Sequence, residues 1–67
     1  MTGKRIGKVL QTRREAKGLT QEDLAKRAKV ARSYLAKLEA GHSKNPSLAV
    51  LQRLAKALGV PVTELLG

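Results

Sequence analysis

The stretch TQEDLAKRAKVARSYLAKLEAG, residues 20–41, contains two short amphipathic segments in succession. In the first segment Leu24 and Ala28 share one side, as the 3.6-residue period of a helix requires. In the second segment Leu35 and Leu38 do the same, and only a few residues separate the two segments. That separation leaves room for one tight turn, so the stretch predicts two short helices that cross steeply.

The first of these helices has a clear start signal. The hydroxyl of Thr20 can cap a helix while Asp23 reaches back in a capping-box-like arrangement, so we expect the helix to begin at Gln21. The second helix should begin near Ala31. Its outer face is small, polar and basic, with flanking residues on either side: Ser33, Ala36, Lys37 and Ala40, flanked by Arg32 and Tyr34. Such a face suits a nucleic-acid groove better than open solvent, which favours several Glu and Lys pairs.

Charge supports an anionic partner. The chain carries 14 Lys and Arg against 5 Asp and Glu, a formal net charge of +9, and twelve of these cations lie between Lys4 and Lys44. The remainder of the chain holds only Arg53 and Lys56 against Glu64. This uneven distribution predicts one anion-facing part of the molecule. The alternative is a generally basic domain without a specific partner.

Outside this stretch, apolar spacing predicts three more helices. The first is expected over residues 5–17 and stops at Gly18. The next follows the stretch, begins at its cap Ser47 and ends at Gly59. The last is a single turn over residues 63–66. We therefore expect an all-α, compact bundle of five short helices forming one domain, residues 1–67. There is no cysteine, no secretory signal and no apolar run near the ~20 residues of a membrane span, so we expect a cytoplasmic protein.

Several motifs stand at fixed spacing along the chain: Gly18-Leu19-Thr20-Gln21-x-x-Leu24-Ala25, Val30, Ser33-Tyr34-Leu35-x-Lys37-Leu38-Glu39-x-Gly41, Asn45-Pro46-Ser47 and Leu54-Ala55-x-Ala57-Leu58-Gly59-Val60. In these motifs the chain resembles the phage-repressor and Cro-like (Xre) helix-turn-helix family, from about Ile6 to Leu66. The resemblance implies a lambda-repressor-like DNA-binding fold with its helix-turn-helix at about residues 20–41. It also implies a sequence-specific transcriptional regulator that binds double-stranded DNA as a homodimer, reading an inverted repeat through the major groove.

On this DNA-binding hypothesis, position assigns the roles. Base readout falls to Arg32, Ser33, Tyr34, Ala36 and Lys37, because they lie on or beside the outer face of the second helix. Arg32 has the fork geometry for guanine O6 and N7, a contact that discriminates by ~1 to 3 kcal/mol. Core packing is the alternative for the Tyr34 ring. Phosphate contacts fall to the helix start, the following loop and two basic neighbours: Thr20, Gln21, His42, Ser43, Lys44, Asn45, Arg13 and Lys17.

The resemblance also implies an ion pair between Arg14 and Glu39, which otherwise stands on an apolar face. We interpret the pair as structural first and as a positioner of DNA-facing groups second. Three residues depart from the family pattern. Arg13 replaces an apolar residue, Lys29 replaces a Gly that suits left-handed backbone, and Ala31 replaces a Ser or Thr cap.

No catalytic or metal site is expected. His42 is the sole histidine, without a carboxylate or cysteine at ligand spacing, and the adjacent Glu22 and Asp23 diverge on a helix. The sequence therefore predicts no enzyme, metal, cofactor or small-molecule substrate. A competing function is an antitoxin whose main partner is a toxin protein, with DNA binding for autoregulation, although no extension for wrapping a partner is evident. General nucleic-acid packaging is disfavoured because aromatic stacking residues are scarce.

A homodimer needs a contact surface. Three apolar residues near the C-terminus are the candidates: Val62, Leu65 and Leu66. Packing of the last helical turn into the core is an equally good explanation for these side chains. The sequence leaves that choice open.

Overall fold

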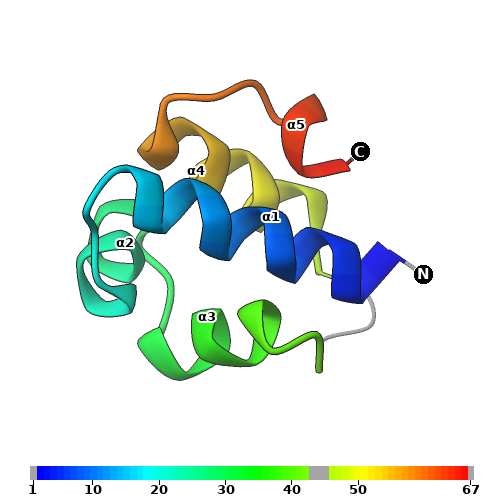
Figure 1. The fold of residues 1–67 in the computed structure, drawn as a ribbon, viewed down its shortest axis with the longest axis horizontal. Coiled ribbons are helices and arrows are strands. Elements are labelled where there is room, and N and C mark those ends of the chain that lie inside the picture. The colour runs from blue at the N-terminus through cyan, green and yellow to red at the C-terminus, as the bar shows by residue number, and fades with distance from the viewer. Residues whose placement is uncertain (1, 43–45, 67) are drawn as a thin grey trace.

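Helices account for all the regular structure in the computed structural model, which describes residues 2–42 and 46–66. The helices are α1 Thr2–Ala16, α2 Gln21–Ala28, α3 Arg32–Glu39, α4 Leu48–Leu58 and α5 Thr63–Leu66 (Figure 1). The predicted all-α fold of five short helices is confirmed. The predicted start of the first helix at Arg5 is wrong, because apolar periodicity marks only the turns that pack and the helix extends beyond them to Thr2.

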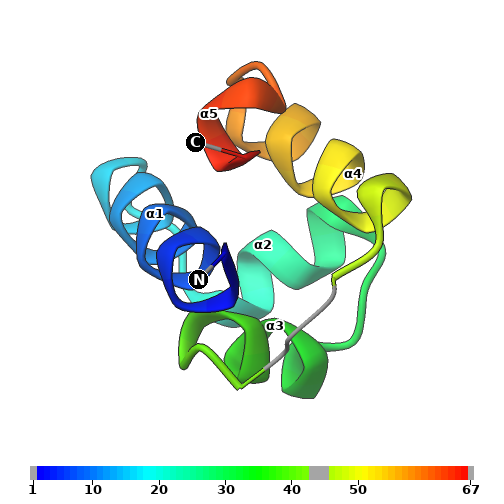
Figure 2. The same ribbon diagram turned by 90° about the vertical axis from the view of Figure 1, so that its right-hand side faces the viewer.

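Helix α1 lies between α3 and α5 in the view of Figure 1. It contacts α3 on one side and α5 on the other, while α2 contacts both α3 and α4 (Figure 1). Turned by 90°, the same arrangement shows α3 at one edge, beneath α2 and α1, with α4 and α5 at the opposite edge (Figure 2). One surface of α3 is consequently left free of other helices.

The helix ends follow the signals in the sequence. The Thr20 hydroxyl accepts a hydrogen bond from the Asp23 amide at 3.0 Å, and the Asp23 carboxylate accepts one from the Thr20 amide at 3.1 Å. Hydrogen bonding of the Asp23 carboxyl group with the backbone, and also with the side chain, of Thr20 lowers its pKa. The Ser47 hydroxyl caps α4 by accepting a hydrogen bond from the Val50 amide, and Gly59 ends α4 with a φ of 72°. The predicted start of α2 at Gln21 and the predicted caps of α4 at Ser47 and Gly59 are confirmed.

Among the described residues, leucine supplies eight of the twelve buried apolar residues of the core, and the others are Ile6, Ala25, Ala28 and Ala55. The seven largest fully buried side chains of the core are Leu10, Leu24, Leu35, Leu38, Leu54, Leu58 and Leu65. Leu65 is therefore wrong as a candidate dimer contact, because α5 folds back onto α1 and its side chain is 0% exposed. Val62 packs partly buried against the same core, whereas Leu66 remains 45% exposed.

Gly7 sets the distance between α1 and α3. It is buried, and a Cβ added to it would lie 2.1 Å from the backbone oxygen of Leu38 and 2.9 Å from that of Glu39. Those separations are far below van der Waals contact. The backbone of α3 can therefore approach α1 this closely only because residue 7 has no side chain.

The turn between α2 and α3 carries two local costs. Lys29 ends α2 with φ 59° and ψ 46°, the left-handed conformation that disfavours residues with a Cβ. Ala31 stands at the N-cap of α3 and makes no side-chain hydrogen bond there. Both departures expected at the sequence level are confirmed, and the turn keeps its place through tertiary packing.

Gly7→Ala should destabilise the protein by about 1 to 3 kcal/mol, because overpacking outweighs the better helix propensity of alanine. Urea denaturation would measure the change. Thr12→Ala, at an exposed position of the same helix, is the control and should leave stability unchanged or slightly higher. A Gly7→Ala protein as stable as the wild type would show that α1 and α3 lie further apart.

Lys29→Gly and Ala31→Ser should each stabilise the protein by about 1 kcal/mol, through relief of left-handed strain and through a new cap. Thermal melts of both variants would test this. Lys26→Gly, at an exposed position in the last turn of α2, is the matched control and should lose about 1 kcal/mol. Equal melting temperatures for Lys29→Gly and Lys26→Gly would contradict the assigned backbone conformation.

Candidate nucleic-acid interface

Helix α3 presents a polar and basic outer surface. Arg32, Ser33 and Lys37 are exposed, whereas Leu35 and Leu38 are fully buried beneath them. The two other proposed readout residues, Tyr34 and Ala36, are half-buried. Tyr34 also packs against the core, which agrees with the alternative role of core packing for its ring. The outer surface of α3 thus exposes two cations and a hydroxyl group, while its inner face is apolar and packs into the core.

The N-terminus of α2 lies beside the start of α3 and offers free backbone donors. Thr20 caps the amide of Asp23, while the amides of Gln21 and Glu22 have no acceptor within the helix. Unpaired amides at the positive end of a helix favour anions. This end of α2 can therefore donate hydrogen bonds to a phosphate oxygen.

An open hollow of about 630 Å³ joins these two helix starts. Its lining comes from α1, the loop after it, α2 and α3: Arg14, Gly18, Leu19, Thr20, Gln21, Glu22 and Arg32. The guanidinium of Arg32 and the first amides of α2 consequently border one depression. A phosphate and a base edge of one duplex can be contacted from it together.

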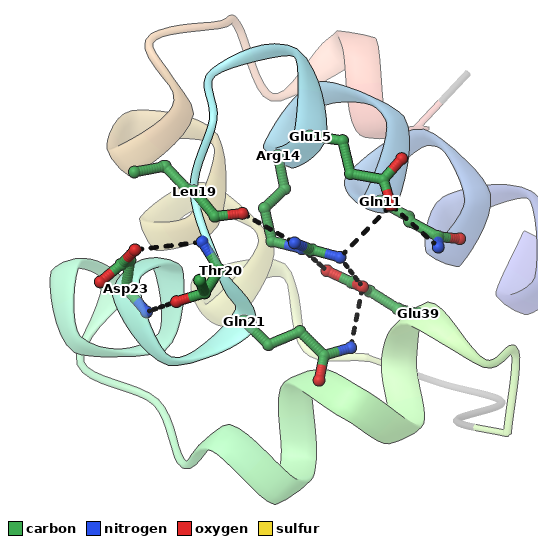
Figure 3. Close-up of polar contacts among 8 residues, drawn as sticks. All are labelled: Gln11, Arg14, Glu15, Leu19, Thr20, Gln21, Asp23 and Glu39. Carbon is green, nitrogen blue, oxygen red and sulfur yellow. Dashed lines mark hydrogen bonds and ion pairs between the residues drawn. The ribbon is translucent and has the colours of Figure 1, made fainter.

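Beneath this hollow lies a buried ion pair (Figure 3). Arg14 Nε donates to Glu39 Oε2 at 2.8 Å and Arg14 Nη2 donates to Glu39 Oε1 at 3.0 Å, which makes the pair bidentate. The side chains are only 11% and 4% exposed. Hydrogen bonding to Glu39 raises the pKa of Arg14, so the guanidinium stays charged despite its burial.

Two further hydrogen bonds extend the pair to neighbouring elements. Arg14 Nη1 donates to the backbone oxygen of Leu19 at 2.7 Å, and Gln21 Nε2 donates to Glu39 Oε1 at 3.0 Å (Figure 3). The Arg14–Glu39–Gln21 network therefore fastens α1, the loop after α1 and the start of α2 to the end of α3. Sequence reasoning gave Gln21 a phosphate contact but missed its bond to Glu39, which no local pattern signals.

The other predicted phosphate contacts lie in different places. Arg13 forms an ion pair with Glu64 of α5, and the Lys17 ammonium lies 3.3 Å from where a Cβ on Gly59 would stand, at the end of α4. Helix α5 and the end of α4 lie on the side of the molecule opposite α3 (Figure 1), so these two cations are not part of the candidate interface on α3. His42 follows α3 and is exposed. Three loop residues lie outside the described part of the chain: Ser43, Lys44 and Asn45.

Residues 2–42 and 46–66 contain no group of three or more His, Cys, Asp or Glu side chains placed to hold a metal ion. Within the same ranges, no helix combines the length and apolar character needed to cross a bilayer. The chemistry of this surface is hydrogen bonding and charge.

Comparison with known proteins identifies relatives of the whole arrangement. The family model HTH_3, described as helix-turn-helix, matches residues 10–65. The immunity repressor protein of Bacillus phage phi105 is 40% identical over 62 residues, a match that covers 92% of this chain and 42% of that protein. The chain thus spans less than half of that relative.

Two solved structures are similar in both sequence and fold. The restriction-modification controller protein C.AhdI from Aeromonas hydrophila has a TM-score of 0.87 and 40% identity, covering 92% of each chain. The master regulator for biofilm formation SinR, solved in complex with DNA, has a TM-score of 0.89 and 37% identity over 92% of this chain and 98% of its own. These relatives are named as regulators rather than enzymes, and they give the antitoxin alternative no support.

Removal of either partner of the buried pair should destabilise the protein by about 3 kcal/mol, because the other charge is left unpaired. Arg14→Ala and Glu39→Ala can be compared by urea denaturation, and the double variant should lose less than the sum of the two. Arg13→Ala is the matched control: its pair with Glu64 is 47% and 39% exposed, so the loss should stay below about 1 kcal/mol. Equal losses for Arg13→Ala and Arg14→Ala would disprove the special role of the buried pair.

Proposed function

The chain belongs to the HTH_3 family of helix-turn-helix domains, and from this premise we propose that it binds double-stranded DNA sequence-specifically as a transcriptional regulator. Support comes from the exposed cations of α3, the net charge of +9 and the similarity to SinR, which was solved bound to DNA. In this proposal α3 enters the major groove.

Specificity resides in the outer surface of α3. Arg32, at the start of the helix, donates in bidentate fashion to guanine O6 and N7. Lys37 lies about one turn further along and reaches a guanine or a phosphate. Ser33 makes a close polar contact, and the methyl group of Ala36 meets a thymine methyl group. Tyr34, whose ring is half-buried, contributes at most its edge at the groove wall.

Register comes from contacts to the phosphate backbone. The first amides of α2, at Gln21 and Glu22, donate to one phosphate, and the exposed His42 is placed after α3 to reach another. The loop residues Ser43, Lys44 and Asn45 complete the proposed set on sequence grounds. These contacts orient the domain and carry no sequence information.

The protein acts as a homodimer on an inverted repeat, because one domain of this size reads only a few base pairs. Half-sites about one helical turn apart would place the two copies of α3 on one face of the DNA. The exposed Leu66, with Val62 beside the core, is the remaining candidate contact between copies. We propose that the protein is cytoplasmic and binds its DNA there.

One observation carries this proposal. Arg32 and the free amides of α2 border a single hollow, and the Arg14–Glu39–Gln21 network beneath fixes α2 relative to α3. Groups that read bases and groups that bind phosphate are thereby held in one rigid arrangement. Such preorganisation lowers the entropic cost of binding.

Selection of binding sites from a random duplex library at about 150 mM salt would test the proposal. Wild type should yield an inverted repeat with a guanine preference in each half-site. Arg32→Ala should lose that preference at one position per half-site, equivalent to ~1 to 3 kcal/mol. Arg13→Ala, which removes the same charge on the side of α5, should return the wild-type consensus.

Two outcomes would count against sequence-specific regulation. One is the absence of any consensus, with binding that disappears as salt rises, because that pattern reports charge alone. The other is an equal change of consensus in both variants, because the guanine would then not be read by Arg32. A palindromic consensus from wild type supports the homodimer at the same time.

A further inference from the structure

A second groove lies between the end of α2 and the outer side of α4 and has a volume of about 300 Å³. Four cations and two alanines line it: Arg27, Ala28, Lys29, Arg53, Lys56 and Ala57. We refer to it as the α2–α4 groove. The proposed DNA contacts use none of these six residues.

The cations of the α2–α4 groove have no acidic partner in the lining. In the described part of the chain, the ion pairs join Arg13, Arg14 and Lys26 to carboxylates and include none of these four cations. The acid nearest in sequence is Asp23, one turn before Arg27, and it already accepts the hydrogen bond that caps α2. Asp23 acts on Arg27 through its charge alone, so none of the four cations is held in an ion pair within the described residues.

Helix-end electrostatics explain only part of this cluster. Cations in the last turn of α2 or α4 interact favourably with the negative end of the helix dipole. Arg53 stands in the middle of α4, away from both ends, and has no such explanation. Arg53 and Lys56 are moreover the only basic residues after Lys44, and both line this groove.

The α2–α4 groove and the hollow of the proposed DNA interface share no residue. Helix α2 begins at the hollow beside Arg32 and ends at this groove, so its eight residues separate the two by about 12 Å. Figure 2 shows the end of α2 beside α4, with α3 at the opposite edge of the molecule. A ligand in the groove would leave the outer surface of α3 free.

We propose that the α2–α4 groove binds an acidic, amphipathic segment of another protein. Carboxylates of that segment pair with the four cations, and a small apolar side chain rests on an apolar floor made of the half-buried methyl group of Ala57 and the aliphatic stems of the Arg and Lys side chains. The apolar floor decides between possible anions, because a sugar-phosphate backbone offers it no apolar side chain. This inference goes beyond DNA binding and does not depend on it.

The test uses a helix-forming peptide of about 16 residues, built from Leu, Glu and Ala, as the probe. Binding is measured by fluorescence anisotropy of the labelled peptide and by amide chemical shifts of the ¹⁵N-labelled protein, at about 150 mM salt. Two matched peptides replace Glu by Gln or Leu by Ser. A DNA duplex of random sequence serves as the competing anion.

The Leu and Glu peptide should shift amides at the end of α2 and around Arg53 in α4. Arg53→Glu/Lys56→Glu should weaken its binding at least about tenfold, because attraction becomes repulsion. Arg5→Glu/Lys8→Glu changes the net charge equally at exposed positions of α1 and should weaken binding only about twofold. Arg53→Gln/Lys56→Gln provides a second variant if charge reversal disturbs the fold, and thermal melts of each variant check this.

Three results would overturn the proposal. Equal weakening by the two charge-reversed variants would mean that overall charge attracts the peptide. Equal binding of the Gln peptide would mean that the carboxylates are not recognised. Displacement of the peptide from these amides by random duplex DNA would assign the groove to a phosphate backbone. The readout contains no operator DNA, so its failure is separate from failure of the regulatory function.

Discussion

The Arg14–Glu39 pair is the contact on which the functional surface depends. Two charges withdrawn from water are stable only when each is fully hydrogen-bonded, and here the carboxylate accepts from Arg14 and Gln21 while the guanidinium also donates to the backbone of Leu19. Satisfying these bonds requires α1, α2 and α3 to adopt one relative position. Burial of the small leucine core stabilises the fold but is not directional, so the hydrogen bonds of the polar network fix how the helices are oriented.

Local signals made much of the fold predictable. Capping by Thr20 and Ser47 and the left-handed stop at Gly59 depend on residues close in sequence, and each marked a helix end correctly. Long-range contacts gave weaker signals. Nothing in the sequence around Gly7 shows that another backbone will lie 2.1 Å from its absent Cβ, because that contact exists only after α1 and α3 pack.

Only part of the candidate site could be predicted from the sequence. Helical periodicity placed Arg32 and Lys37 on the outer surface of α3, because that surface follows from the buried leucines. It could not place Arg13 or Lys17, since a flexible cation turns toward whichever partner the fold brings near, here α5 and the end of α4. The sequence left dimer contact and core packing open for Leu65 for a related reason: an apolar residue in a last turn packs wherever that turn docks, here in the core.

The close approach at Gly7 holds α3 in place through its inward side, whereas the residues proposed to contact DNA lie on its outward side. The helix is seated through the backbone oxygens of Leu38 and Glu39 and through buried leucines, all of which face inward. Its outward residues take no part in that seating. The outer positions can therefore be exchanged as a set while the helix keeps its orientation, which makes this scaffold suited to acquiring new target sequences by substitution at a few exposed positions.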